Sequence, residues 1–144
     1  IVWVLRRKRR KPVTVLPPPP VDWRVEVGKI ARMGLMEKGD YKQFYTLLSE
    51  LFRRYLEAEV GIEAMERTTR EIATDMNKGS ISDATITATR AFLLDADLVK
   101  FAKFRPPEEV VRAASKQVLE LIQRLESTPT PAAQEKISTT GTSG

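Results

Sequence analysis

Hydrophobic residues recur at helical spacing from about residue 22 to residue 126. The clearest segment is residues 40–60, where apolar side chains recur every three or four residues: Tyr41, Phe44, Leu48, Leu51 and Tyr55. Such a stripe places apolar side chains on one face of an α-helix. No segment alternates between hydrophobic and polar residues as a half-buried strand would. The pattern predicts an all-α fold with helices at residues 22–38, 40–60, 68–78, 82–94, 95–104 and 107–126.

Residues typical of helix ends stand at several of these boundaries. Thr68 and Glu71 fit a capping box, in which each side chain accepts a hydrogen bond from the other residue's backbone N–H. Ser82 can cap the helix that follows it, and Pro107 suits the first turn of the last helix. Gly61 follows a helical run, where glycine adopts the left-handed conformation at little cost. We therefore expect a compact bundle of about five to six helices at residues 22–126.

The polar face of the helix at 40–60 offers two carboxylate–arginine pairs at i,i+4 spacing. Glu50 can pair with Arg54, and Arg53 can pair with Glu57. Pairs at this spacing lie side by side on a helix surface. We expect both arginines to be held by these carboxylates.

Residues outside the helical region have a different composition. Residues 12–21 include four consecutive prolines, which favour an extended polyproline II linker. Residues 127–144 are rich in Ser, Thr, Pro and Gly and contain one large apolar residue, so we predict a disordered tail.

The first eleven residues combine an apolar run with a basic one. Ile1 to Leu5 are apolar, whereas spanning a bilayer takes roughly 20 apolar residues. We interpret residues 1–11 as the end of a transmembrane helix and a basic juxtamembrane run, because cations directly after an apolar segment mark the cytoplasmic side. The residues expected at an anionic membrane surface are Arg6, Arg7, Lys8, Arg9, Arg10 and Lys11.

The same basic run allows two other interpretations. It could bind nucleic acid, or it could be a charged tail without a partner. The formal net charge of the chain is +5, and residues 6–11 contribute six positive charges, which leaves −1 for the rest. The high isoelectric point therefore reflects one short segment and does not indicate a basic surface on the helical domain.

The composition removes several kinds of catalytic site. The chain has no Cys and no His, which excludes disulfides, thiol nucleophiles and thiolate or imidazole metal ligands. The pairs Glu57 with Glu59 and Asp95 with Asp97 are two residues apart, so on a helix they point in different directions. There is no glycine-rich phosphate loop. We expect no enzymatic activity, no cofactor, no metal site and no small-molecule substrate.

One candidate binding surface lies in residues 96–107, ADLVKFAKFRPP, where basic and aromatic residues alternate. One reading is structural: Asp95 and Asp97 begin a short helix, basic residues end it in accord with the helix dipole, and Leu98, Phe101 and Ala102 enter the core. The other reading is a surface that binds an acidic protein partner. Its candidate residues are Lys100, Lys103, Phe104 and Arg105. Stacking on nucleic acid is a third reading.

Two stretches resemble a known family when taken in order and spacing. They are GDYKQFYTLLSELFRRYLEAEVGIEAMERTTREI at residues 39–72 and LLDADLVKFAKFRPPEE at residues 93–109. Residues 36–125 resemble the C-terminal cytoplasmic region of bacterial aerotolerance (BatD-like) membrane proteins. The matching positions are Gly39-Asp40, Phe44-Tyr45, Leu48-Ser49-Glu50, Arg53-Arg54-Tyr55-Leu56, Gly61-Ile62, Glu66, Thr68-Thr69 and Ala96–Lys103.

The resemblance implies an extracytoplasmic β-rich region upstream, one transmembrane helix in the bacterial inner membrane, and this region on the cytoplasmic side. It implies partners as well, namely a MoxR-type AAA+ ATPase and von Willebrand A-domain proteins that act in envelope stress or maturation. It brings no catalytic or cofactor residues. Our main hypothesis is a membrane-tethered protein–protein interaction module without catalytic activity. The alternative is a small helical nucleic-acid-binding domain with a basic arm.

Overall fold

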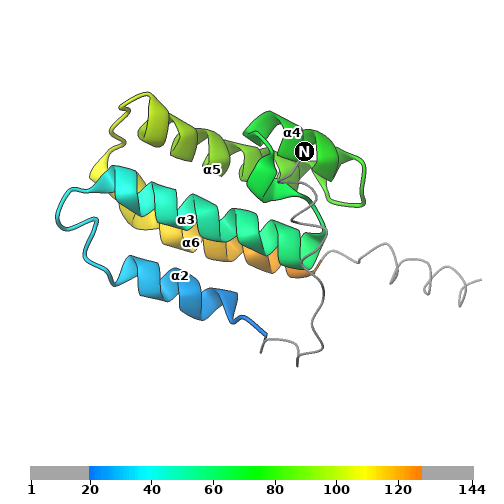
Figure 1. The fold of residues 1–144 in the computed structure, drawn as a ribbon, viewed down its shortest axis with the longest axis horizontal. Helices are drawn as coiled ribbons and strands as arrows, with labels where there is room; N and C mark the ends of the chain where they lie inside the picture. Colours follow the sequence, from blue (N-terminus) through cyan, green and yellow to red (C-terminus); the bar gives the residue numbers. More distant parts are fainter. Residues whose placement is uncertain (1–19, 128–144) are drawn as a thin grey trace, which may run out of the picture.

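The computed structural model describes residues 20–127 and shows an all-α fold (Figure 1). Within this range no residue is in a β-strand, so the predicted fold class is confirmed. A π-helical turn, η1 (Leu56–Val60), directly continues the α-helix that ends at Tyr55. A 3-10 turn, η2 (Ala64–Glu66), follows η1. The α-helices are α2 (Trp23–Ala31), α3 (Tyr41–Tyr55), α4 (Thr69–Asn77), α5 (Asp83–Phe101) and α6 (Glu108–Glu126).

Helices α3 and α6 lie side by side in the middle of the bundle (Figure 1). Helix α2 packs against both of them on one side, and α5 packs against both on the other. The short helix α4 packs mainly against α5. This arrangement leaves one long face of α5 without a covering helix in the described range.

The core is built around α3, whose predicted apolar stripe is buried over its whole length. Its aromatic rings also contact one another and neighbouring helices: Tyr45 stacks with Phe92 of α5, and Phe52 meets the same ring edge-to-face. The predicted core face of α6 is buried as well and comprises Val111, Ala114, Val118, Leu121, Ile122 and Leu125. These two faces supply most of the apolar burial that drives folding.

The predicted caps of α4 and α5 are confirmed, and the start of α6 lies one residue later than expected. The Thr68 side chain accepts from the Glu71 backbone N–H, and the Glu71 carboxylate accepts from the Thr68 N–H, which completes the capping box. Ser82 accepts from the Thr85 N–H at the start of α5. Pro107 stands just before α6, where its missing N–H costs nothing.

The first predicted helix ends earlier than expected. Helix α2 stops at Ala31, and residues 32–40 form turns that contain two left-handed glycines, Gly34 (φ 78°) and Gly39 (φ 76°). Glycine takes this conformation without the steric cost that other residues meet. The chain reverses direction through these turns, and Asp40 then caps α3 by accepting from the Gln43 N–H.

The division of residues 82–104 into two helices is wrong. Helix α5 runs without interruption from Asp83 to Phe101, so Asp95 and Asp97 lie in its second half rather than at a helix start. The physical reason is that residues 82–105 contain neither Gly nor Pro, and two aspartates alone do not end a helix. These two aspartates therefore do not lie at a helix N-terminus and do not stabilise one through its dipole.

The predictions for both flanks lie outside the described residues. These are the transmembrane end and basic run at residues 1–11, most of the proline-rich linker, and the tail beyond Ser127. Among residues 20–127, no helix has the combination of length and apolar character that a bilayer crossing requires.

Candidate functional site

An open groove lies between α3, η2, the start of α4 and the uncovered face of α5. It has a volume of about 770 Å³. Its apolar lining comes from four exposed side chains, Met65, Leu94, Leu98 and Phe101. Charged residues on its walls include Glu50, Arg67 and Lys100. The groove therefore offers an apolar strip with a polar border.

The apolar strip on α5 results from the helical period. Leu94, Leu98 and Phe101 stand at positions i, i+4 and i+7, so they share one face. The buried face of α5 carries Leu93 and Val99 instead. Leu98 and Phe101 were expected in the core, but they are 46% and 76% exposed, and Ala102 is exposed too.

This correction follows from the single long helix. A separate helix starting at residue 95 could rotate so that Leu98 faced the core. In the continuous α5, the residues that face α3 and α6 are set by the whole helix, and Leu98 is not among them. Sequence reasoning missed Leu94 and Met65 as groove residues. The signal that could have identified Leu94 is the i, i+4, i+7 spacing with Leu98 and Phe101.

A polar network of Arg53, Asp97 and Thr69 lies at the base of the groove and connects its walls. The Arg53 guanidinium on α3 donates to the carbonyl oxygens of Ala64 (3.0 Å) and Arg67 (2.6 Å), and it lies 3.9 Å from the Asp97 carboxylate. Asp97 also accepts a 2.7 Å hydrogen bond from the Thr69 hydroxyl. The network thereby ties η2 and the start of α4 to α3 and α5.

The expected pairing of Arg53 with Glu57 is wrong, whereas that of Arg54 with Glu50 is confirmed at 2.8 Å. The Arg53 side chain is 13% exposed and points into the bundle, and Glu57 accepts from the Met65 N–H instead. Burial lowers the pKa of Arg53, and the nearby Asp97 carboxylate opposes this shift. The guanidinium is thus a structural brace for the groove.

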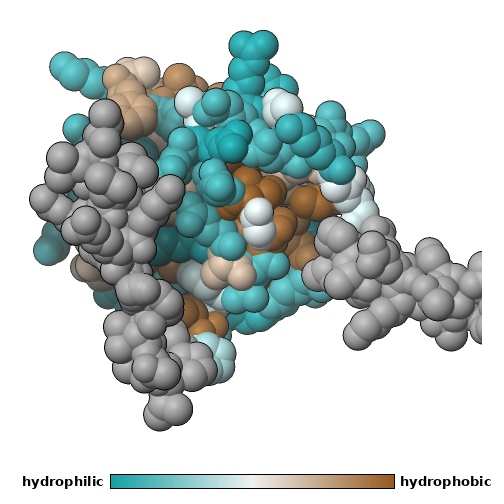
Figure 2. All heavy atoms as spheres, turned by 45° about the vertical axis from the view of Figure 1, so that its right-hand side comes forward, coloured by the Kyte–Doolittle hydropathy of each residue, from teal (hydrophilic) through white to brown (hydrophobic). Residues whose placement is uncertain are grey.

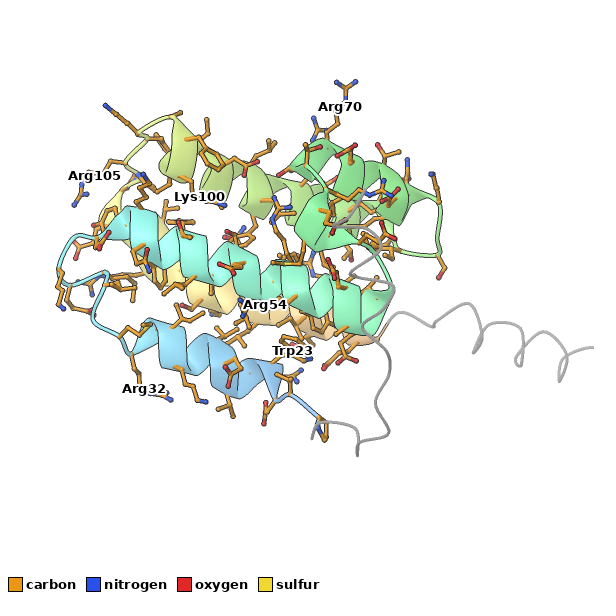
Figure 3. All side chains as sticks on the ribbon, viewed as in Figure 1. Trp23, Arg32, Arg54, Arg70, Lys100 and Arg105 are labelled. Atoms are coloured by element: carbon orange, nitrogen blue, oxygen red, sulfur yellow. The ribbon has the colours of Figure 1, made fainter. Side chains whose placement is uncertain are left out.

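The four candidate partner-binding residues gather at the C-terminal end of α5. Figure 3 shows Lys100 between α5 and α3, and Arg105 at the end of the bundle where α5 is joined to α6. Lys100 lines the groove, and all four residues line a smaller hollow of about 280 Å³ beside it. Phe104 is exposed, as the binding reading expected.

Lys103 has an unusual backbone conformation in this cluster. It has a φ of 57°, and within residues 20–127 it is the only non-glycine residue with a positive φ. The turn is closed by hydrogen bonds from the N–H groups of Ala102 and Phe104 to the Leu98 carbonyl. The left-handed residue redirects the chain at the end of α5 and leaves the Lys103 side chain exposed.

Arg105 has an intramolecular role. Its guanidinium lies over the Tyr41 ring, 4.0 Å from the centroid, and it donates a 3.1 Å hydrogen bond to the Gly39 carbonyl. It therefore fixes the turn before α3 against the α5–α6 connection. Lys100 has a looser contact, with its ammonium 5.0 Å from the Phe101 ring centroid.

Three of the four carboxylates considered for catalysis have structural partners. Glu59 accepts from the Trp23 indole N–H at 3.0 Å, Glu57 accepts from the Met65 N–H, and Asp97 belongs to the Arg53 network. Burial raises the pKa of Asp95. Within the described range no cluster of three or more acidic side chains could hold a metal ion.

The face of the molecule shown in Figure 2 is mostly hydrophilic. On the face shown in Figure 2, hydrophobic residues reach the surface only in patches between hydrophilic side chains. A second hollow of about 700 Å³ lies between α4 and α5 and includes Arg70, which Figure 3 shows pointing into solvent. This hollow lacks the continuous apolar strip of the groove.

Comparisons with protein-family models, with curated proteins and with solved structures gave no match to this chain.

Proposed function

We propose that this chain is a membrane-tethered protein–protein interaction module without catalytic activity. The observation that carries the proposal is the groove with its exposed strip of Leu94, Leu98 and Phe101. Large apolar side chains scattered singly on a surface need no explanation, but a contiguous group with a polar border is typical of interaction sites. In this module the bundle holds the groove rigid and a partner protein covers the strip.

The tether in this proposal is the N-terminal flank. We propose that residues 1–5 belong to the membrane anchor and that the basic residues 6–11 bind the anionic headgroups of the inner membrane. A polyproline II linker with the length of residues 12–21 spans roughly 30 Å, at about 3.1 Å per residue, and we propose that it separates the helical domain from the bilayer. Tethering raises the local concentration of the groove at the membrane without adding a contact.

The partners that we propose come from the BatD-like resemblance. They are a MoxR-type AAA+ ATPase and von Willebrand A-domain proteins of the same bacterium, which this module would recruit to the membrane in envelope stress or maturation. Lys100 and Lys103 form a basic cluster beside the apolar strip, which favours a partner with an acidic surface. Complementary charge mainly increases the association rate and the selectivity of such contacts.

The test is a binding measurement with the full 144-residue chain and the purified ATPase or A-domain protein. We expect saturable binding that weakens in the double variant Lys100→Glu/Lys103→Glu. The control is Lys38→Glu/Lys116→Glu, which makes the same charge change at exposed positions away from the groove. If neither partner class binds, the proposal is contradicted. If both double variants weaken binding equally, Lys100 and Lys103 have no specific role in the contact.

The nucleic-acid alternative makes a different prediction. If the chain worked through its basic arm, it would bind duplex DNA with an affinity that falls steeply as salt rises. Residues outside 6–11 carry a net charge of −1, which disfavours such binding by the helical domain itself. Tight, strongly salt-dependent DNA binding by the full chain would favour this alternative.

A further inference from the structure

We infer that the groove binds an amphipathic helix of the partner protein, with acidic residues at the end beside Lys100 and Lys103. The inference rests on the proposed interaction function and specifies the binding surface and the kind of segment that it accepts. Three features carry it, namely the spacing of the apolar strip, the openness of the groove and the distribution of unpaired charge.

The strip has the length and period of a helix–helix contact. Leu94, Leu98 and Phe101 extend over about 10 Å of helix axis, at 1.5 Å per residue. Met65 from η2 lies across the groove from them and forms part of the opposite wall. A helix with apolar residues at i, i+3 or i+4, and i+7 matches such a surface, and this is the usual form of helix-in-groove recognition.

The groove is a poor site for a small molecule. Pockets for small ligands bury most of the ligand surface, about 70–90%. Here Phe101 remains 76% exposed at the border, and Leu98 remains 46% exposed. A ligand on this strip would keep much of its own surface in water, whereas a helix would cover the strip along its length.

The two ends of the groove differ in charge, because within the described range unpaired positive charge lies at only one of them. The anionic groups on its walls are already paired, since Glu50 contacts Arg54, and Asp97 contacts Thr69 and Arg53. Arg67 lies near Glu63 and Asp75. Among residues 20–127, no carboxylate lies within ion-pair distance of Lys100 or Lys103. The surplus positive charge therefore lies at the C-terminal end of α5, and acidic residues of the bound helix would lie there.

The experiment uses a displayed library of random peptides of about 16 residues, roughly four helical turns. The immobilised full chain selects binders, and the selected peptides are synthesised and measured in solution. Leu98→Glu is the test variant and Val25→Glu the matched control, because Val25 is an equally exposed apolar residue (45%) on α2. Thermal unfolding checks that both variants remain folded.

We expect the selected sequences to share apolar residues at i, i+3 or i+4, and i+7, with acidic residues near one end. They should bind the wild-type chain and Val25→Glu equally and Leu98→Glu roughly 30-fold more weakly, the loss typical of a central interface residue. In Lys100→Glu/Lys103→Glu the preference for acidic peptides should disappear, and binding should respond less to salt.

Three results would overturn the inference: no selected peptide, selected peptides without the apolar spacing, or equal binding to Leu98→Glu. A chain dimer that Leu98→Glu disperses would assign the groove to a second copy instead. Failure here is distinguishable from failure of the proposed function. If the chain binds the ATPase and Leu98→Glu does not weaken this binding, only the groove is excluded as the binding site. If the chain binds the selected peptides but neither the ATPase nor the A-domain protein, only the proposed partners are excluded.

Discussion

Arg53 points from α3 into the bundle, where it donates hydrogen bonds to the carbonyl oxygens of Ala64 and Arg67, whereas its neighbour Arg54 stays exposed beside Glu50. Removing a partner from a buried polar network leaves the remaining groups unsatisfied, which costs much more than losing an exposed ion pair.

We therefore predict that Arg53→Ala lowers the free energy of unfolding by about 2 to 4 kcal/mol. Arg54→Ala should lower it by no more than about 0.5 kcal/mol. Chemical denaturation of both variants measures the difference. Similar losses at the two positions would contradict the role of Arg53 as the brace of the groove floor.

Lys103 shows backbone strain beside the groove. A non-glycine residue in the left-handed region costs about 1 kcal/mol or more, and such strain is often retained at functional surfaces. Lys103→Gly should raise the free energy of unfolding by about 0.5 to 1 kcal/mol, after allowing for the greater freedom of glycine in the unfolded chain.

The matched control for Lys103→Gly is the reverse change at a left-handed glycine. Gly61 has a φ of 83° and open space around it, so Gly61→Ala tests conformation without a steric clash. We expect it to lower the free energy of unfolding by about 1 kcal/mol. A destabilising effect of Lys103→Gly would show that Lys103 is not strained.

At the scale of elements, α5 has two apolar faces with different roles. Leu93 is fully buried in the core, whereas Leu98, five residues further along, faces the groove. Leu93→Ala should lower the free energy of unfolding by about 2 to 5 kcal/mol, the range for a buried leucine, and Leu98→Ala by no more than about 0.5 kcal/mol. Denaturation curves of the two variants test this assignment, and a large loss for Leu98→Ala would place Leu98 in the core after all.

Most helices could be predicted from the sequence because local signals specify them. The apolar stripe of α3 fixed its buried face, and Thr68, Ser82 and Pro107 marked helix starts through side-chain chemistry that acts within one turn. The end of α2 was predicted too far along the chain. The hydrophobic pattern alone does not show whether residues 32–40 continue the helix or form the turns at Gly34 and Gly39. Local propensity is a weak guide to where a helix stops.

The candidate site could be predicted only in part, because it depends on contacts between distant segments. The basic and aromatic residues Lys100, Lys103 and Phe104 were identified from the alternation of basic and aromatic residues in 96–107, and the structure places them together at one end of α5. The stacking of Arg105 on Tyr41 and the bonds from Arg53 to the η2 region join residues that no short-range pattern relates. Whether an apolar helix face is covered is likewise decided by the tertiary fold.

At the scale of the whole molecule, burial of tyrosines makes the fold sensitive to alkaline pH. Burial, followed by the Asp95 charge, raises the pKa of Tyr45 to about 12, and burial raises that of Tyr55 to about 12 as well. An unfolded tyrosine ionises near pH 10, about two units lower. The folded state thus keeps these protons, and the associated stabilisation is complete below about pH 10 and is lost as the pH rises toward 12.

Replacing Tyr45 by Phe should therefore move the alkaline unfolding midpoint upward. Each tyrosine can account for about 2 to 3 kcal/mol of the loss between these pH values. Circular dichroism against pH, together with the ultraviolet absorbance of tyrosinate, measures this effect for the wild-type chain and Tyr45→Phe. Identical alkaline curves for both would mean that Tyr45 ionises without unfolding the core.

The most direct test of the proposed interaction module follows the groove itself during binding. In a methyl NMR titration of the full chain with the MoxR-type ATPase, we predict that the signals of Met65, Leu94 and Leu98 shift or broaden first. The exposed methyl groups of Val25 on α2 and Val110 on α6 serve as internal controls and should remain unchanged. Changes at Val25 and Val110 with none at the groove, or no change at any methyl group, would contradict the account.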